Sequence, residues 1–124
     1  MTLQIDINHK AAELWEITLT GSLDSETAPQ LDKELETVLD SGSKKVIFNM
    51  KELDYISSAG LKIIAKVCRM MKEADGDVIA TEMQPQIKTV FEIVKKLPNL
   101  RMFNNQEEAD EYLDAIQEFV KSKT

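Results

Sequence analysis

Apolar and polar residues alternate in two segments near the start of the chain, 2–8 and 14–20. An apolar residue at every second position is typical of a β-strand that buries one of its faces. These apolar positions are Leu3, Ile5 and Ile7 in the first segment, and Trp15, Ile17 and Leu19 in the second. The two segments therefore predict an opening hairpin.

A helical pattern follows the hairpin. The residues after Gly21 include serine, aspartate and threonine, which commonly cap helices, and Pro29, which suits a first turn. Apolar residues then recur at helical spacing until Gly42. They are Leu31, Leu35, Val38 and Leu39. This segment predicts the first helix.

The middle of the chain reads as a strand, a helix and a second strand. The short apolar run 46–48 predicts a central strand that is covered on both faces. The next helix is expected to begin within 57–60 and to run to about Ala74, with Gly76 marking its end. Residues 78–80 then predict another short buried strand. Two strands joined through a helix in this way run parallel.

Two more helices complete the pattern. The third is expected to stop before Pro98, and the last to begin with Asn105 as its cap and acidic residues in its first turns. The apolar face of the third helix consists of Ile87, Val90, Phe91 and Val94. The apolar face of the last helix consists of Tyr112, Leu113, Ile116, Phe119 and Val120. A short edge strand is expected between these helices, with Leu100, Met102 and Phe103. This order predicts one α/β domain over residues 1–124, with a mixed, mostly parallel sheet of about four to five strands and about four helices.

Composition and charge narrow the functions that this fold can carry. The 124 residues contain 15 basic and 22 acidic side chains, and the resulting net charge of −7 repels a nucleic acid backbone. Cys68 is the only cysteine and His9 the only histidine, which excludes an intrachain disulfide and a two-histidine metal set. The first residues lack a basic segment followed by an apolar run, so we expect no signal segment, and nowhere do about 18 apolar residues run together. We expect a soluble, cytoplasmic protein with no metal, no nucleic acid partner and no membrane insertion.

Enzyme chemistry finds little support in the residue pattern. A serine nucleophile needs a base within hydrogen-bond reach, and His9 falls in the turn of the predicted hairpin. The phosphate-binding patterns G-x-x-x-x-G-K-[ST] and G-x-G-x-x-G are both absent. Acidic pairs on the helices, such as Asp110 and Glu111, are expected on solvated faces. The sequence therefore predicts a protein that is not an enzyme and that needs no cofactor.

The segment from Leu53 to Leu61 combines two hydroxyl groups with the start of a helix. It follows the predicted central strand, and open α/β sheets carry their functional sites at the carboxyl ends of strands. Ser57 and Ser58 are either helix caps or a functional pair.

The helix that follows these serines favours a function in binding. Its apolar residues cover a wider arc than a core-facing helix needs, which leaves part of the surface for a partner. They are Leu61, Ile63, Ile64, Ala65, Val67, Cys68, Met70 and Met71. Its polar edge is a basic stripe on an acidic protein, formed by Lys62, Lys66, Arg69 and Lys72. A solvated face is the simpler interpretation of such a stripe, but beside exposed hydroxyls a binding surface is favoured.

Two motifs resemble the STAS family, the anti-sigma factor antagonists that bacteria use in partner switching. The residues Gly21-Ser22-Leu23-Asp24, ahead of a helix with Thr27 and Ala28, look like the family's G-x-L-D turn. The residues Asp54 to Leu61 look like its D-x-x-D-S-[ST]-G-L switch segment. The order of the predicted elements is similar over essentially the whole chain.

The resemblance implies a regulatory cycle. In the family, the unmodified protein binds a serine kinase that doubles as an anti-sigma factor, so the sigma factor is set free. Phosphorylation of one serine reverses this binding, and a serine phosphatase resets it. By position the phosphorylated residue is Ser58, with Ser57 as the alternative because it stands where many members carry aspartate. A phosphate at the first turn of a helix meets free N–H groups and a favourable dipole, so we expect the fold to survive and the partner to be lost.

The resemblance also implies a partner-binding surface. It consists of Asp24, Ser57, Ser58, Ala59, Gly60, Leu61, Lys62, Ala65, Lys66 and Arg69. A second hypothesis is a constitutive scaffold, or a lipid-transporter subunit, of the same fold without a phosphorylation switch. A third is an enzyme or nucleotide-binding protein that uses Asp24 and residues 57–60, which the missing base, metal set and phosphate loop disfavour.

Overall fold

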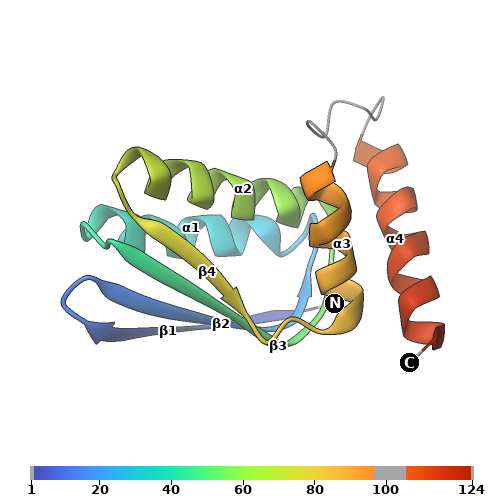
Figure 1. Ribbon diagram of the computed structural model, residues 1–124, viewed down its shortest axis with the longest axis horizontal. Helices are drawn as coiled ribbons and strands as arrows, with labels where there is room; N and C mark the ends of the chain where they lie inside the picture. Colours follow the sequence, from blue (N-terminus) through green and yellow to red (C-terminus); the bar gives the residue numbers. More distant parts are fainter. Residues whose placement is uncertain (1, 97–105, 124) are drawn as a thin grey trace.

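The computed structural model describes residues 2–96 and 106–123, which contain four strands and four helices (Figure 1). Their bounds are β1 (Leu3–Ala11), β2 (Leu14–Leu23), α1 (Ala28–Asp40), β3 (Lys45–Ile56), α2 (Ser58–Glu73), β4 (Asp77–Thr81), α3 (Pro85–Lys96) and α4 (Gln106–Lys123). The predicted strand at residues 100–103 and the predicted cap Asn105 lie outside the described residues.

The four strands form one sheet in the order β1-β2-β3-β4. β1 and β2 are antiparallel, with Ile7 opposite Ile17, which confirms the opening hairpin. β3 runs parallel both to β2, with Phe48 opposite Ile17, and to β4, with Phe48 opposite Ala80. The sheet is therefore mixed and mostly parallel, as predicted, and β3 is a central strand.

Helices α1 and α2 lie side by side over one face of the sheet, and α3 and α4 pack together at one end of it (Figure 1). Both crossovers step in the same direction, from β2 to β3 and from β3 to β4, so right-handed connections place their helices on the same face. The hydrophobic core fills the space between. Its largest fully buried side chains include Ile17, Leu19, Leu31, Leu35, Phe48 and Met50.

The opposite face of the sheet is mostly polar, so the prediction that residues 46–48 are covered on both faces is wrong. In register, this face carries Gln4, Asp6, Asn8, Glu16, Thr18, Thr20 and Asn49. Ile47 on this face is only half-buried, and its neighbour Ile79 is 40% exposed. The predicted buried strand at residues 78–80 is thus a half-exposed edge strand, because β4 has a neighbour on one side only.

Two further predictions need correction. His9 is a residue of β1 rather than of the turn, and its ring stacks on Trp15 with centroids 4.2 Å apart. On α4, Leu113 is buried, but Tyr112 and Phe119 are 45% and 62% exposed, so the predicted apolar face only partly meets the core. The reason is that α4 lies beside α3 at one end of the molecule, so only one side of the helix faces the rest of the fold (Figure 1).

Among the helices of the described residues, none is long and apolar enough to cross a membrane.

Candidate functional site

The two motifs of the sequence meet at the carboxyl ends of β2 and β3. Because these strands are parallel neighbours, Leu23 at the end of β2 lies opposite Ile56 at the end of β3. The chain then turns into α2, and the Ser57 N–H donates to the Leu23 carbonyl at 2.8 Å. Strand β3 extends to Ile56, so the first half of the segment 53–61 belongs to the strand rather than to a loop after it.

Asp24 shapes the chain between β2 and α1. Its Oδ1 accepts hydrogen bonds from the backbone N–H groups of Glu26 and Thr27, at 2.9 and 3.0 Å. The Thr27 hydroxyl donates to the Ser22 carbonyl at 2.8 Å and so fixes the turn on the strand. The aspartate of the G-x-L-D motif thus has a structural function at the start of α1.

Gly60 and Leu61, which the resemblance assigns to the partner surface, lie inside the molecule. A Cβ atom on Gly60 would stand 2.6 Å from Leu23 Cγ and 3.0 Å from the Leu23 carbonyl oxygen. Leu61 is only 4% exposed and belongs to the core. Gly60 therefore lets the first turn of α2 approach β2 closely, and Leu61 contributes to the core beneath the helix.

The two serines at the start of α2 are buried, contrary to the expectation of exposed hydroxyls. Ser57 and Ser58 are 3% and 1% exposed. Ser57 is the N-cap of α2, and its hydroxyl oxygen accepts from the Gly60 N–H at 3.3 Å. Ser58 is the first helical residue, and its N–H and its hydroxyl both donate to Oδ1 of Asp110, at 2.8 and 2.7 Å.

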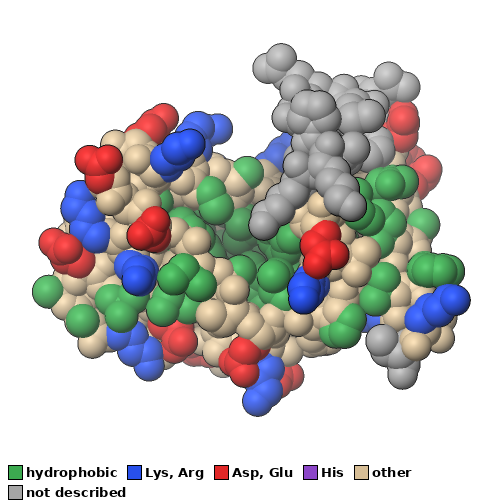
Figure 2. Space-filling view, viewed as in Figure 1, with side chains coloured by type: hydrophobic (Ala, Val, Ile, Leu, Met, Phe, Trp, Pro, Cys, Tyr) green, Lys and Arg blue, Asp and Glu red, His purple; other side chains and the backbone are tan. Residues whose placement is uncertain are grey.

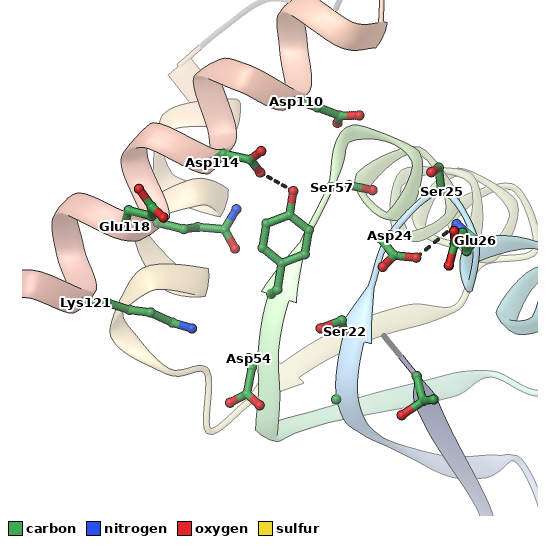
Figure 3. Close-up of a pocket in the computed structure, with 14 residues that line it drawn as sticks. Ser22, Asp24, Ser25, Glu26, Asp54, Ser57, Asp110, Asp114, Glu118 and Lys121 are labelled. Atoms are coloured by element: carbon green, nitrogen blue, oxygen red, sulfur yellow. Dashed lines mark hydrogen bonds between the residues drawn. The ribbon is translucent and has the colours of Figure 1, made fainter.

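Asp110 was expected on a solvated face, and this expectation is wrong. It lies on α4, which brings its carboxylate to the first turn of α2 (Figure 3). A carboxylate is stabilised at this position by the free N–H groups and the positive end of the helix dipole. The sequence carried no local signal for this contact, because 52 residues separate the two partners.

Two more side chains of α4 bind the end of β3. The Asp114 carboxylate accepts a hydrogen bond from the Tyr55 hydroxyl (Figure 3). Burial, followed by this hydrogen bond and the charge of Asp114, raises the pKa of Tyr55 above its ordinary value. The buried Gln117 accepts from the Ile56 N–H at 3.0 Å and donates to the Ile56 carbonyl at 2.9 Å. Its amide therefore satisfies both backbone groups of the last residue of β3.

A hollow beside these contacts is acidic. Figure 3 shows its wall between β2, β3 and α4. The charged side chains that line it are Asp24, Glu26, Asp54, Asp110, Asp114, Glu118 and Lys121. Within the described residues, no group of three or more histidine, cysteine or acidic side chains is arranged to hold a metal ion.

The exposed face of α2 carries the basic stripe. Lys62, Ala65 and Arg69 are exposed, and Ala59 is half-buried on the same side of the helix. Lys66 donates to Asp32 of α1 at 2.9 Å, so its charge is partly neutralised. Acidic and basic side chains are interspersed over the face of the molecule that Figure 2 shows.

Comparison with known proteins identifies the family. The model of the STAS domain matches residues 6–109. A relative from Bordetella bronchiseptica, named as an anti-sigma factor antagonist, BtrV, is 35% identical over 91 residues, which cover 73% of this chain and 78% of the relative. This chain therefore belongs to the STAS domain family, as the resemblance predicted.

Solved structures agree with the fold. The unphosphorylated form of the anti-sigma factor antagonist SpoIIAA matches with a TM-score of 0.68 and 20% identity, over 74% of this chain and 81% of that one. The phosphorylated form of SpoIIAA from Bacillus matches with a TM-score of 0.64 and 22% identity, over 73% of this chain and 82% of that one. The mixed four-stranded sheet with its helices is thus the fold of SpoIIAA.

Proposed function

We propose that the protein is an anti-sigma factor antagonist that acts by binding, without catalysis of its own, in the cytoplasm. The unphosphorylated form binds an anti-sigma factor that is also a serine kinase, and the sigma factor is released. Phosphorylation of Ser58 blocks this binding, and a serine phosphatase restores it. The family membership supports this proposal, as do the relative named as an anti-sigma factor antagonist and the solved unphosphorylated and phosphorylated forms of SpoIIAA.

The observation that carries the proposal is the position of Ser58. It is the first residue of α2, on the helix whose exposed side carries Lys62, Ala65 and Arg69. A phosphoserine adds about −1.5 to −2 charges at pH 7. In an interface this charge has to be desolvated, and without a matching cation on the partner it weakens binding strongly.

The partner surface is proposed to run along α2 from the start of the helix to Arg69. Its accessible members are Ala59, Lys62, Ala65, Lys66 and Arg69. Of the other proposed members, Asp24 is half-buried, and Ser57, Ser58, Gly60 and Leu61 are buried at the start of the helix.

The modified residue is tested by two alanine variants. With the cognate kinase and ATP, Ser58→Ala is expected to abolish phosphate incorporation, measured by intact mass. Ser57→Ala is expected to keep most of it, although the loss of the N-cap costs about 1 kcal/mol of stability. Circular dichroism confirms that both variants are folded. If Ser57→Ala alone removes the phosphate, the modified serine is Ser57.

A constitutive scaffold, or a lipid-transporter subunit, is the second candidate. It is favoured by the burial of Ser58, whose hydroxyl is held by Asp110 and is 1% exposed. A protein of this kind would bind its partner equally well whether or not Ser58 carries a phosphate.

A further inference from the structure

The contact between Ser58 and Asp110 blocks the proposed modification site. The Ser58 hydroxyl donates to Asp110 Oδ1 at 2.7 Å, and the residue is 1% exposed. Phosphorylation transfers the γ-phosphoryl group of ATP to this hydroxyl oxygen, while ADP leaves and the hydroxyl proton passes to a base of the kinase. The oxygen therefore has to reach the active site of the kinase, and with α4 in this position it cannot.

The carboxylate of Asp110 also occupies the position that a phosphate would take. It accepts from the Ser58 N–H at 2.8 Å, at the positive end of α2. A phosphate on Ser58 and the Asp110 carboxylate would compete for the same N–H group, and their negative charges would repel each other. Docking of α4 therefore disfavours phosphorylation of Ser58, and a phosphate on Ser58 disfavours docking of α4.

Helix α4 is attached to this site along one of its faces. Asp110, Asp114 and Gln117 are spaced by four and three residues, so they lie on one side of the helix. They hold Ser58, Tyr55 and Ile56 in turn, three residues in one continuous stretch at the end of β3 and the start of α2. The contact also has an apolar part, since Ala109 and Leu113 are buried and Ile116 packs against the core, whereas Tyr112 and Phe119 stay exposed. When α4 leaves, its polar contacts can be exchanged for water, and the exposure of these apolar side chains opposes the detachment.

We propose that α4 is an intramolecular latch that keeps Ser58 from being phosphorylated, and that it has to detach before the kinase can act. This inference rests on Ser58 being the modified residue. Once Ser58 is phosphorylated, repulsion between the phosphate and Asp110 keeps α4 detached. The position of α4 therefore controls access to Ser58 and is itself changed by the phosphorylation. The family match ends at Ala109, so Asp110, Asp114 and Gln117 belong to a part of the chain beyond the matched residues.

The test uses two variants that loosen the latch at different points. Asp110→Ala removes both hydrogen bonds to Ser58, whereas Tyr55→Phe removes only the hydroxyl held by Asp114 and does not touch the serine. Glu111→Ala is the matched control, because it removes the same charge from an exposed position of the same helix. For each protein, hydrogen exchange of the Ile56 amide reports whether α4 is docked, since that N–H is held by Gln117.

The rate of phosphate incorporation at Ser58 is measured on the same proteins with the cognate kinase and ATP. In Asp110→Ala we expect both the exchange at Ile56 and the incorporation rate to rise by at least about tenfold, because two hydrogen bonds to a charged acceptor are lost. In Tyr55→Phe both should rise by a smaller factor, and in Glu111→Ala neither should change. Faster exchange with an unchanged incorporation rate would overturn the latch and leave the proposed function standing. Failure of every variant to incorporate phosphate would overturn the proposed function, and the latch with it.

Discussion

Gly60 shows how closely the first turn of α2 packs on β2. The position of a Cβ atom on this residue is 2.6 Å from the Leu23 side chain and 3.0 Å from the Leu23 carbonyl oxygen. A side chain can change its rotamer, but the carbonyl belongs to a strand and has little room to move. The serine pair beside Gly60 is therefore held in place by backbone packing as well as by its own hydrogen bonds.

Gly60→Ala is expected to lower the free energy of unfolding by about 1–2 kcal/mol. Overpacking costs about 1–3 kcal/mol, and we expect the upper part of this range here because the crowded carbonyl belongs to the backbone; the better helix propensity of alanine, about 1 kcal/mol, then offsets part of the cost. Urea denaturation followed by circular dichroism measures the change. Ala65→Ser, at an exposed position of the same helix, is the control and should change the free energy by less than about 0.5 kcal/mol. A Gly60→Ala protein as stable as the wild type would show that the two elements are not in such tight contact.

For single residues, contacts between neighbours in the sequence could be predicted, and contacts between distant segments could not. A helix cap was one of the two interpretations that the sequence left open for Ser57, and Ser57 is the N-cap of α2 through its bond to Gly60. Asp110 lies among other acids on a helix and has no local feature that separates it from Glu111. Only the packing of α4 at the end of the sheet brings Asp110 to Ser58 and leaves Glu111 exposed.

At the scale of elements, α2 has two faces with different functions. Leu61, Ile64, Val67 and Met71 are buried against the sheet, and Lys62, Ala65 and Arg69 are exposed. The wide apolar arc predicted for this helix is confirmed in part, because Met70 is 38% exposed. The exposed side is therefore available to a partner without any rearrangement of the core.

Reversing two charges tests the exposed face of α2. The double variant Lys62→Glu and Arg69→Glu is expected to associate more slowly with the anti-sigma partner and to show a weaker dependence on salt, because charges at the rim of an interface act mainly by steering. Stopped-flow or surface plasmon resonance measurements over a range of ionic strength give both quantities. The control, Lys33→Glu with Lys88→Glu, makes the same change in net charge at exposed positions of α1 and α3. Equal association kinetics for both double variants would show that the basic stripe of α2 faces solvent and does not contact the partner.

The four strands of the described residues were predicted in order and direction, but their burial was predicted less well. The apolar run 46–48 indicates a central strand, and β3 is one. Periodicity cannot tell whether the second face of a strand meets another layer or solvent. That depends on the direction of the crossovers, which places α1 and α2 on the same face and leaves the other face polar.

At the scale of the whole molecule, the site joins the central part of the chain to helix α4. The central part, from β2 to α2, positions Ser58, and the last helix covers it. The order of elements predicted the family fold, which the match over residues 6–109 confirms. The contact of α4 with the site could not be predicted, because it depends on a tertiary arrangement that no pattern within the helix encodes.

The central claim is that the charge state of Ser58 decides whether the partner binds. It is tested most directly by isothermal titration of the anti-sigma partner with two samples of this protein, unmodified and phosphorylated on Ser58, at the same ionic strength. We expect phosphorylation to weaken the affinity by at least about tenfold, which is about 1.4 kcal/mol, while the cooperative thermal unfolding of the sheet and its core is retained. Equal affinity of the two samples would overturn the phosphorylation switch and favour a constitutive scaffold.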